Sequence, residues 1–139
     1  MANKRLLVVD AQGGGIGKQV IAEVKRRELP VEIFAAGTNS VAVQAMHKAG
    51  ADHAVTGENA VIVCSRTADY IIGPIGVVIA DAMYGEITPA MARAVGQSGA
   101  EKMLILVNHC SNYIAGISGS TIKSMVAETV ERLERLLNQ

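Results

Sequence analysis

Short runs of apolar, β-branched residues alternate along the chain with segments in which apolar residues recur every fourth position. The first run, residues 4–10 (KRLLVVD), is typical of a strand buried in a parallel sheet. The spacing then changes, because Ile16, Val20 and Val24 are separated by mostly polar and charged positions. That pattern predicts an amphipathic helix, which ends before Pro30.

The same alternation continues along the rest of the chain. Further strands are predicted over residues 31–36, 53–56, 69–73 and 102–108. Further helices are predicted over residues 40–49, 58–66, 74 to about 83, 88 to about 97, and 122–137. Strands that alternate with helices predict an α/β fold, a three-layer sandwich around a five-stranded parallel sheet with a Rossmann-like, doubly wound topology. We expect residues 1–139 to form a single domain.

The C-terminal helix has the clearest amphipathic pattern. Its apolar stripe consists of Ile122, Val126, Val130, Leu133 and Leu137, and Glu–Arg pairs four residues apart lie on the other side. Such a stripe either covers the sheet of its own chain or joins two chains. A homodimer is therefore one possible assembly.

The turns that leave the predicted strands differ in composition from those that enter them. Glycine and small polar residues concentrate in the strand-to-helix turns, whereas the helix-to-strand turns are ordinary surface turns. In an open parallel sheet all strand-to-helix turns meet at the carboxyl edge, where ligands bind near the topological switch point. We therefore predict a ligand site at this edge. Its predicted residues are Gly13, Gly14, Gly15, Ile16, Gly17, Lys18, Thr38, Asn39, Ser40, Gly73, Pro74, Ile75, Gly76 and Asn108.

The loop after the first strand is the strongest candidate for an anion site. Residues 13–17 (GGGIG) open a helix directly after that strand. Glycine lets backbone amides approach a ligand closely, and a helix N-terminus adds free N–H groups and a partial positive charge. Lys18 either adds a full charge or faces solvent. The alternative is a tight turn that permits close helix–sheet packing.

The loop does not match the standard nucleotide motifs. Lys18 stands where the GxGxxG dinucleotide fingerprint requires its third glycine. Gly15–Gly17 match the TGxxxGIG loop of short-chain dehydrogenases, but this sequence lacks the catalytic Tyr-xxx-Lys pair of that family. Residues 38–40 (TNS) stand where an acid would bind the adenosine ribose. An NAD(P)-linked protein stays an alternative, whereas Gln19 replaces the hydroxyl that holds Mg²⁺ in NTPases.

Three residues are candidates for acid–base chemistry. Asp10 ends the first strand and either caps the glycine loop or acts as a base. Glu58 complements the dipole of the helix that it opens, or serves as a general acid or base. His109 is the histidine best placed for proton transfer. Asp81 and Glu86 are interpreted as solvated.

Composition excludes several classes of partner. Thirteen basic and thirteen acidic residues give no net charge, so no global field attracts nucleic acid or anionic membrane. Four aromatic residues are too few for a base-stacking platform. Cys64 and Cys110 form no CxxC motif, and no metal site is expected. No segment has the pattern of a signal peptide or a membrane span, so we expect a cytoplasmic protein.

Five segments together resemble a known family: DAQGGGIGKQ, GTNSVA, GADHAVTGENAV, ADYIIGPIGVVIADAMYGEITPAMA and LILVNHC. They are similar to a small uncharacterised bacterial family, a domain of unknown function found mainly in anaerobic Firmicutes. Its members usually read DGQGGGIG, so Ala11 departs from the pattern. The resemblance implies a self-contained Rossmann-like domain and no particular reaction. We expect the chain to bind a nucleotide or another phosphorylated small molecule; the alternative is a sensory or assembly module.

Overall fold

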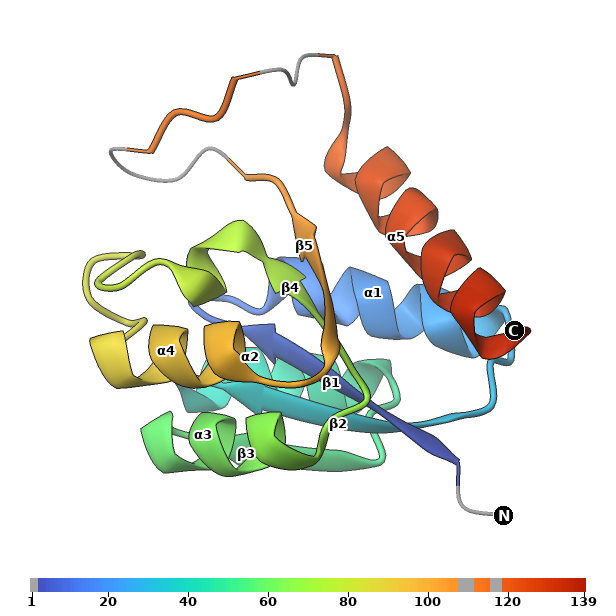
Figure 1. Ribbon diagram of the computed structural model, residues 1–139, viewed down its shortest axis with the longest axis horizontal. Helices are drawn as coiled ribbons and strands as arrows, with labels where there is room; N and C mark the ends of the chain where they lie inside the picture. The colour runs from blue at the N-terminus through green and yellow to red at the C-terminus, as the bar shows by residue number, and fades with distance from the viewer. Residues whose placement is uncertain (1–2, 108–111, 116–118) are drawn as a thin grey trace.

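The computed structural model describes residues 3–107, 112–115 and 119–139 of the 139-residue chain. Within these residues one five-stranded sheet has the order β3-β2-β1-β4-β5, and every pair of neighbours is parallel (Figure 1). The strands are β1 (Lys4–Asp10), β2 (Val31–Gly37), β3 (His53–Thr56), β4 (Tyr70–Pro74) and β5 (Glu101–Ile105). The helices are α1 (Gly15–Arg26), α2 (Ser40–Ala49), α3 (Glu58–Thr67), the 3-10 helix η1 (Ile75–Val78), α4 (Pro89–Gln97) and α5 (Ile122–Leu137). The predicted α/β fold with a five-stranded parallel sheet is confirmed.

Helices cover both faces of the sheet. In the central strand β1, Leu6 and Val8 point to the face covered by α1, α2 and α5. Leu7 and Val9 point to the opposite face, which is covered by α3 and α4. A strand buried on both sides needs apolar residues at consecutive positions, which explains the unbroken LLVV run.

The chain changes direction between β1 and β4. The connection from β1 leads to α1 on one face, and the connection from β4 leads through η1 to α4 on the other. The connections that leave the carboxyl ends of these two neighbouring strands therefore go to opposite faces of the sheet. This divergence is the topological switch point of the sheet, where open α/β folds have their crevice.

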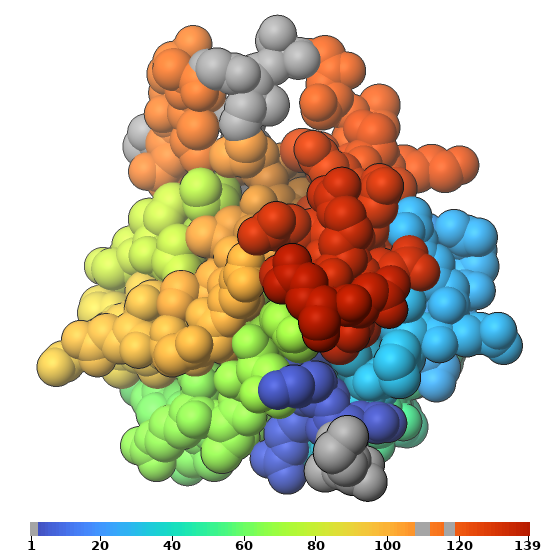
Figure 2. Space-filling model, turned by 45° about the vertical axis from the view of Figure 1, so that its right-hand side comes forward, coloured from blue at the N-terminus to red at the C-terminus, as the bar shows by residue number. Residues whose placement is uncertain are grey.

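The apolar stripe of α5 packs within its own chain. Val126, Val130 and Leu133 are buried in the cluster that also contains residues of α1 and β5. Thr121 and Ser124 form a reciprocal capping box that starts the helix. Figure 2 shows α5 lying on the surface beside α1. No helix among the described residues is long and apolar enough to cross a bilayer.

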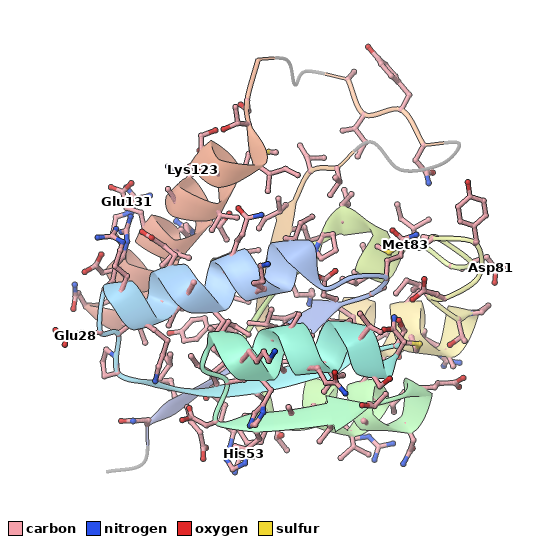
Figure 3. The ribbon with its side chains drawn as sticks, turned by 180° about the vertical axis from the view of Figure 1, so that it is seen from behind. Glu28, His53, Asp81, Met83, Lys123 and Glu131 are labelled. Atoms are coloured by element: carbon pink, nitrogen blue, oxygen red, sulfur yellow. The ribbon has the colours of Figure 1, made fainter. Side chains whose placement is uncertain are left out.

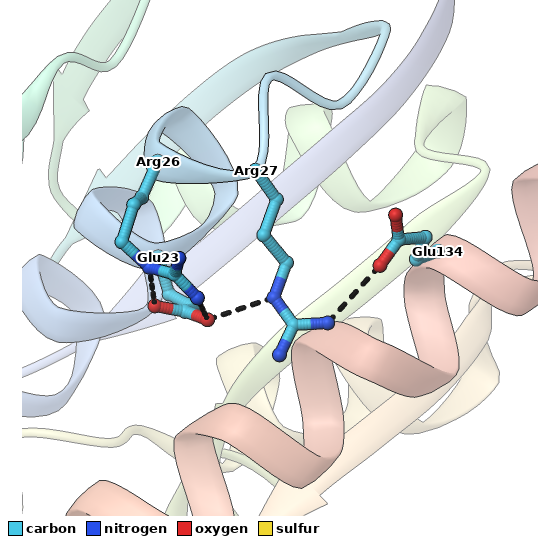
Figure 4. Close-up of polar contacts among 4 residues, drawn as sticks. All are labelled: Glu23, Arg26, Arg27 and Glu134. Carbon is cyan, nitrogen blue, oxygen red and sulfur yellow. Dashed lines mark hydrogen bonds and ion pairs between the residues drawn. The ribbon is translucent and has the colours of Figure 1, made fainter.

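An ion-pair network joins α5 to the C-terminal end of α1 (Figure 4). Arg27 contacts the carboxylate of Glu23 at 2.7 Å and that of Glu134 at 3.0 Å. Arg26 contacts the same Glu23 carboxylate at 2.6 Å. Hydrogen bonds from Arg26 and Arg27 lower the pKa of Glu23 to about 2.

We expect this network to make the fold sensitive to acid. Since the folded pKa of Glu23 lies below its ordinary value of 4.5, the network stabilises the fold above that pH. The contribution is lost as pH falls towards about 2. Urea unfolding at neutral and acid pH should show that Arg27→Met loses about 1 kcal/mol at pH 7 and little at low pH. Arg135→Met, which removes an arginine without an ion pair among the described residues, should match the wild type at both pH values.

The predicted helix over residues 74 to about 83 is wrong. β4 extends through Pro74, which pairs with Ile105 of β5, and only η1 follows as a single 3-10 turn. Asp81, Met83 and Tyr84 have φ values of 64°, 59° and 58°, which no right-handed helix contains. The fifth strand is also displaced from the predicted 102–108, because it begins at Glu101 and ends at Ile105.

Candidate functional site

The loop that joins β1 to α1 turns sharply against the first turn of α2. Gly14 has a φ of 71°, in the left-handed region that favours glycine. A Cβ on Gly14 would lie 2.7 Å from the carbonyl oxygen of Ala42. Conformation and packing therefore both require glycine at this position.

Gly13 and Gly15 lie in a different environment. Neither has a positive φ, and a Cβ on either would meet no atom within 4 Å. The N–H groups of Gly15 and Ile16, at the N-terminus of α1, have no acceptor within the described part of the chain. The packing of the chain thus gives no reason for glycine at 13 and 15, whereas a ligand resting on the backbone would give one.

Asp10 caps the glycine loop from inside. Its carboxylate is buried and accepts hydrogen bonds from the N–H of Ala11 at 2.8 Å and the N–H of Gly17 at 2.7 Å. Gly17 has no room for a side chain, because a Cβ there would lie 2.6 Å from the sulfur of Met46. Asp10 therefore occupies the third N–H group of α1 and leaves the first two for another acceptor.

A hollow of about 250 Å³ opens beside the glycine loop. It lies where β1 and β4 end, at the switch point of the sheet. Its walls come from the glycine loop and the start of α1, the end of β4, the loop between η1 and α4, the segment after β5, and the start of α5. The lining residues are Asp10, Ala11, Gln12, Gly13, Gly14, Gly15, Ile16, Gln19, Pro74, Met83, Val107 and Ile122.

Glu86 joins three loops of the carboxyl edge. Its Oε1 accepts hydrogen bonds from the N–H of Gln12 at 2.9 Å, the hydroxyl of Thr38 at 2.6 Å and the amide of Asn39 at 3.0 Å. Burial by itself would raise the pKa of Glu86, but the hydrogen bonds from Thr38, Gln12 and Asn39 outweigh it and lower the pKa. Glu86 is therefore ionised at neutral pH and holds the glycine loop from outside, as Asp10 does from inside.

The structure does not bring all the predicted ligand residues to the hollow. Thr38 and Asn39 hydrogen-bond to Glu86, and the Asn39 side chain also accepts from the N–H of Ala42 to cap α2. Ser40 is an exposed residue at the start of α2. Lys18 faces a groove between α1 and α2, so it adds no charge to the hollow.

The turn after β4 contributes one lining residue, Pro74. Gly73 packs on the carbonyl of Val9, and Gly76 packs on the side chain of Met83. Ile75 begins η1 and does not line the hollow.

The three acid–base candidates are not gathered at one point. Asp10 lies at the back of the hollow, whereas Glu58 is exposed in the first turn of α3 and is not among the lining residues. His109 and Asn108 fall outside the described residues. The described residues therefore bring one of the three candidates to the hollow.

The interpretation of Glu86 as a solvated residue missed the three hydrogen bonds that it accepts, and the sequence carries no signal for them. Residues 79–88 form an irregular loop that lies beside the glycine loop (Figure 3). Met83 and Ile87 are buried on either side of Glu86 and fix the loop to the molecule. No spacing rule links position 86 to positions 12, 38 and 39. Only the folded chain brings them together.

The fold and the hollow define a Rossmann-like α/β protein with a glycine loop at its switch point. The chain belongs to the family described as "Domain of unknown function (DUF3842)", which matches residues 5–138. No curated protein matches the sequence. Among solved structures, the chain is similar to a dodecameric FMN-dependent UbiX-like decarboxylase from Escherichia coli O157:H7. The identity is 18%, the match covers 93% of this chain and 76% of that chain, and the TM-score is 0.46, too low to support a function.

Proposed function

We propose that this protein binds a nucleotide or another phosphorylated small molecule at the carboxyl edge of its sheet. The phosphate rests on residues 13–16, and the rest of the ligand extends into the neighbouring hollow. The observation that carries the proposal is the open space at Gly13 and Gly15, next to two N–H groups without acceptors among the described residues. A helix N-terminus of this kind supplies the donors and the partial positive charge that a phosphate requires.

The attraction for the anion is local. The protein has no net charge, and Lys18 lines a groove between α1 and α2 instead of the hollow. Backbone N–H groups are therefore the donors, because the buried Asp10 carboxylate accepts from the N–H groups of Ala11 and Gly17 and not from those of Gly15 and Ile16. An assembly role for α5 has no comparable support, because its apolar stripe is buried in its own chain.

A thermal-shift experiment with one charged variant tests the proposal. The wild type should be stabilised by at least one of AMP, FMN, NAD⁺, coenzyme A and glucose 6-phosphate, with a rise in Tm of several degrees near saturation. Gly15→Asp places a carboxylate where the phosphate rests, so titration calorimetry should show binding weakened at least tenfold. The variant should still fold, since an acid in the first turn of a helix is favourable.

The matched control is Gly99→Asp. Gly99 also has open space and no positive φ, and it lies in the turn before β5 at the opposite edge of the sheet. The Gly99→Asp variant carries the same added charge away from the glycine loop, so it should bind the phosphorylated compound as tightly as the wild type does. If no compound raises the Tm of the wild type, or if Gly15→Asp binds as tightly as Gly99→Asp, the proposal is wrong.

A further inference from the structure

A carboxylate lies at the end of β2, although the sequence places no acid there. β2 ends at Gly37, and the next residues are Thr38 and Asn39. Both donate to Glu86, which comes from the loop after β4, 47 residues further along the chain from Asn39. The fold thus brings to the end of the second strand the type of side chain that the local sequence lacks.

The two oxygens of this carboxylate have different surroundings. Oε1 accepts all three hydrogen bonds, from Gln12, Thr38 and Asn39. Oε2 has no hydrogen-bond partner in the part of the chain that the structure describes. Glu86 is only partly buried. Because an ionised carboxylate has about four lone-pair sites, Oε2 can accept further donors.

The loop that carries Glu86 is held firmly by its own backbone. The N–H of Asp81 donates to the carbonyl of Ile87 at 2.7 Å, and the N–H of Glu86 donates to the carbonyl of Met83 at 3.2 Å. Buried Met83 and Ile87 anchor the loop on both sides of Glu86. The carboxylate is therefore positioned before any ligand arrives, which lowers the cost of binding.

Glu86 does not line the hollow, but it lies beside the glycine loop, which forms one wall of the hollow and carries the proposed phosphate site. The N–H of Gln12 donates to Glu86, and Gln12 stands three residues before Gly15 in the same loop. In dinucleotide-binding folds, an acid at the end of the second strand accepts a hydrogen bond from a ribose hydroxyl, while the glycine loop binds the phosphate. A ribose 5′-phosphate joins both groups in one molecule.

We infer that the ligand is a ribonucleotide, and that Glu86 Oε2 accepts a hydrogen bond from its ribose diol. This inference rests on the proposed phosphate site. The other polar side chains at the end of β2 are already engaged: the Thr38 hydroxyl donates to Glu86, and the Asn39 oxygen caps α2. Glu86 Oε2 is therefore the acceptor that this corner offers to a diol.

Pairs of ligands that differ by one hydroxyl test the inference. Titration calorimetry would compare AMP with 2′-deoxyadenosine 5′-monophosphate, and ribose 5-phosphate with 2-deoxyribose 5-phosphate. The wild type should bind the ribose compound of each pair about tenfold more tightly, because a hydrogen bond to a charged group is lost with the hydroxyl. The second pair shows the preference without any contribution from a base.

Glu86→Gln removes the acceptor and retains the size of the side chain. Its amide oxygen can still accept from Gln12, Thr38 and Asn39, which places the NH₂ group where Oε2 was. The preference for ribose should then fall to about twofold or less. Asp81→Asn is the control, because it makes the same change at an exposed position of the same loop and should keep the tenfold preference.

The outcomes separate this inference from the proposed function. If phosphorylated compounds bind but the wild type does not distinguish ribose from deoxyribose, the inference is wrong and the phosphate site stands, whether or not the variant folds. If Glu86→Gln keeps the full preference, Glu86 is not the diol acceptor. If none of these phosphorylated compounds, nor any in the thermal-shift panel, binds, both proposals fail.

Discussion

Replacement of Gly73 by alanine should destabilise the protein by about 3 kcal/mol, at the upper end of the usual range for an overpacked core position. A Cβ at this position would lie 2.5 Å from the carbonyl oxygen of Val9 in the neighbouring strand β1. The obstacle is backbone rather than a flexible side chain, so β1 and β4 would have to move apart. Both strands lie in the middle of the sheet, where a shift disturbs packing on two faces.

Urea unfolding followed by circular dichroism measures this loss, and Gly96→Ala is its control. Gly96 lies within α4, has no positive φ, and has open space where a Cβ would be. The same substitution there should stabilise the protein by about 0.5–1 kcal/mol, because alanine is the better helix former. Equal stabilities for Gly73→Ala and the wild type would contradict the close approach of β1 and β4.

Asp10→Asn should produce the second largest effect, a loss of about 2–3 kcal/mol of folding free energy. The two carboxylate oxygens accept from the N–H groups of Ala11 and Gly17. An amide offers only one oxygen, so its NH₂ group would face one of these N–H donors in a buried site. The loop would lose its internal support, and we expect phosphate binding to weaken with it.

Glu58→Gln serves as the matched control for Asp10→Asn. Glu58 loses the same charge, but it is exposed in the first turn of α3. Its contribution is restricted to the helix dipole, so its removal should cost about 0.5 kcal/mol. Chemical denaturation of both variants at neutral pH gives the comparison. A loss below 1 kcal/mol for Asp10→Asn would show that the cap contributes little.

The parts of the fold that could be predicted from sequence are those in which local pattern and burial agree. β1 reads as a buried strand because apolar side chains fill both faces, and α5 reads as a helix because its stripe fits one face. Thr88 and Pro89 mark the start of α4, where the Thr88 side chain accepts from the N–H of Met91. Each of these signals depends on residues within one or two turns of each other.

The segment after β4 could not be predicted in the same way. Val77, Met83 and Ile87 are all buried, so the apolar content resembles that of a helix. Tertiary packing nevertheless holds Asp81, Met83 and Tyr84 in the left-handed region, which is rare for residues other than glycine. Local propensities cannot predict a loop whose conformation is determined by contacts with other loops.

The features of the candidate site also fall into those that are local in sequence and those that depend on contacts between distant residues. The glycine loop and the carboxyl edge could be inferred from composition, because glycine and turn position are local features. The role of Glu86 could not, since it depends on contacts with Gln12, Thr38 and Asn39 across at least 47 positions. For Lys18 the sequence left two alternatives open, and the structure places this residue in the groove between α1 and α2 and not among the residues that line the hollow.

The order of the strands affects how the chain forms during synthesis on the ribosome. β1 is made first, yet it occupies the centre of the sheet and pairs with β2 on one side and β4 on the other (Figure 1). Residues 4–56 can form a parallel three-stranded half while the second edge of β1 stays unpaired until residues 70–74 have been translated. An unpaired apolar strand edge is prone to wrong pairing with other chains. The nascent chain therefore passes through a stage at which its most buried strand is the one most open to aggregation.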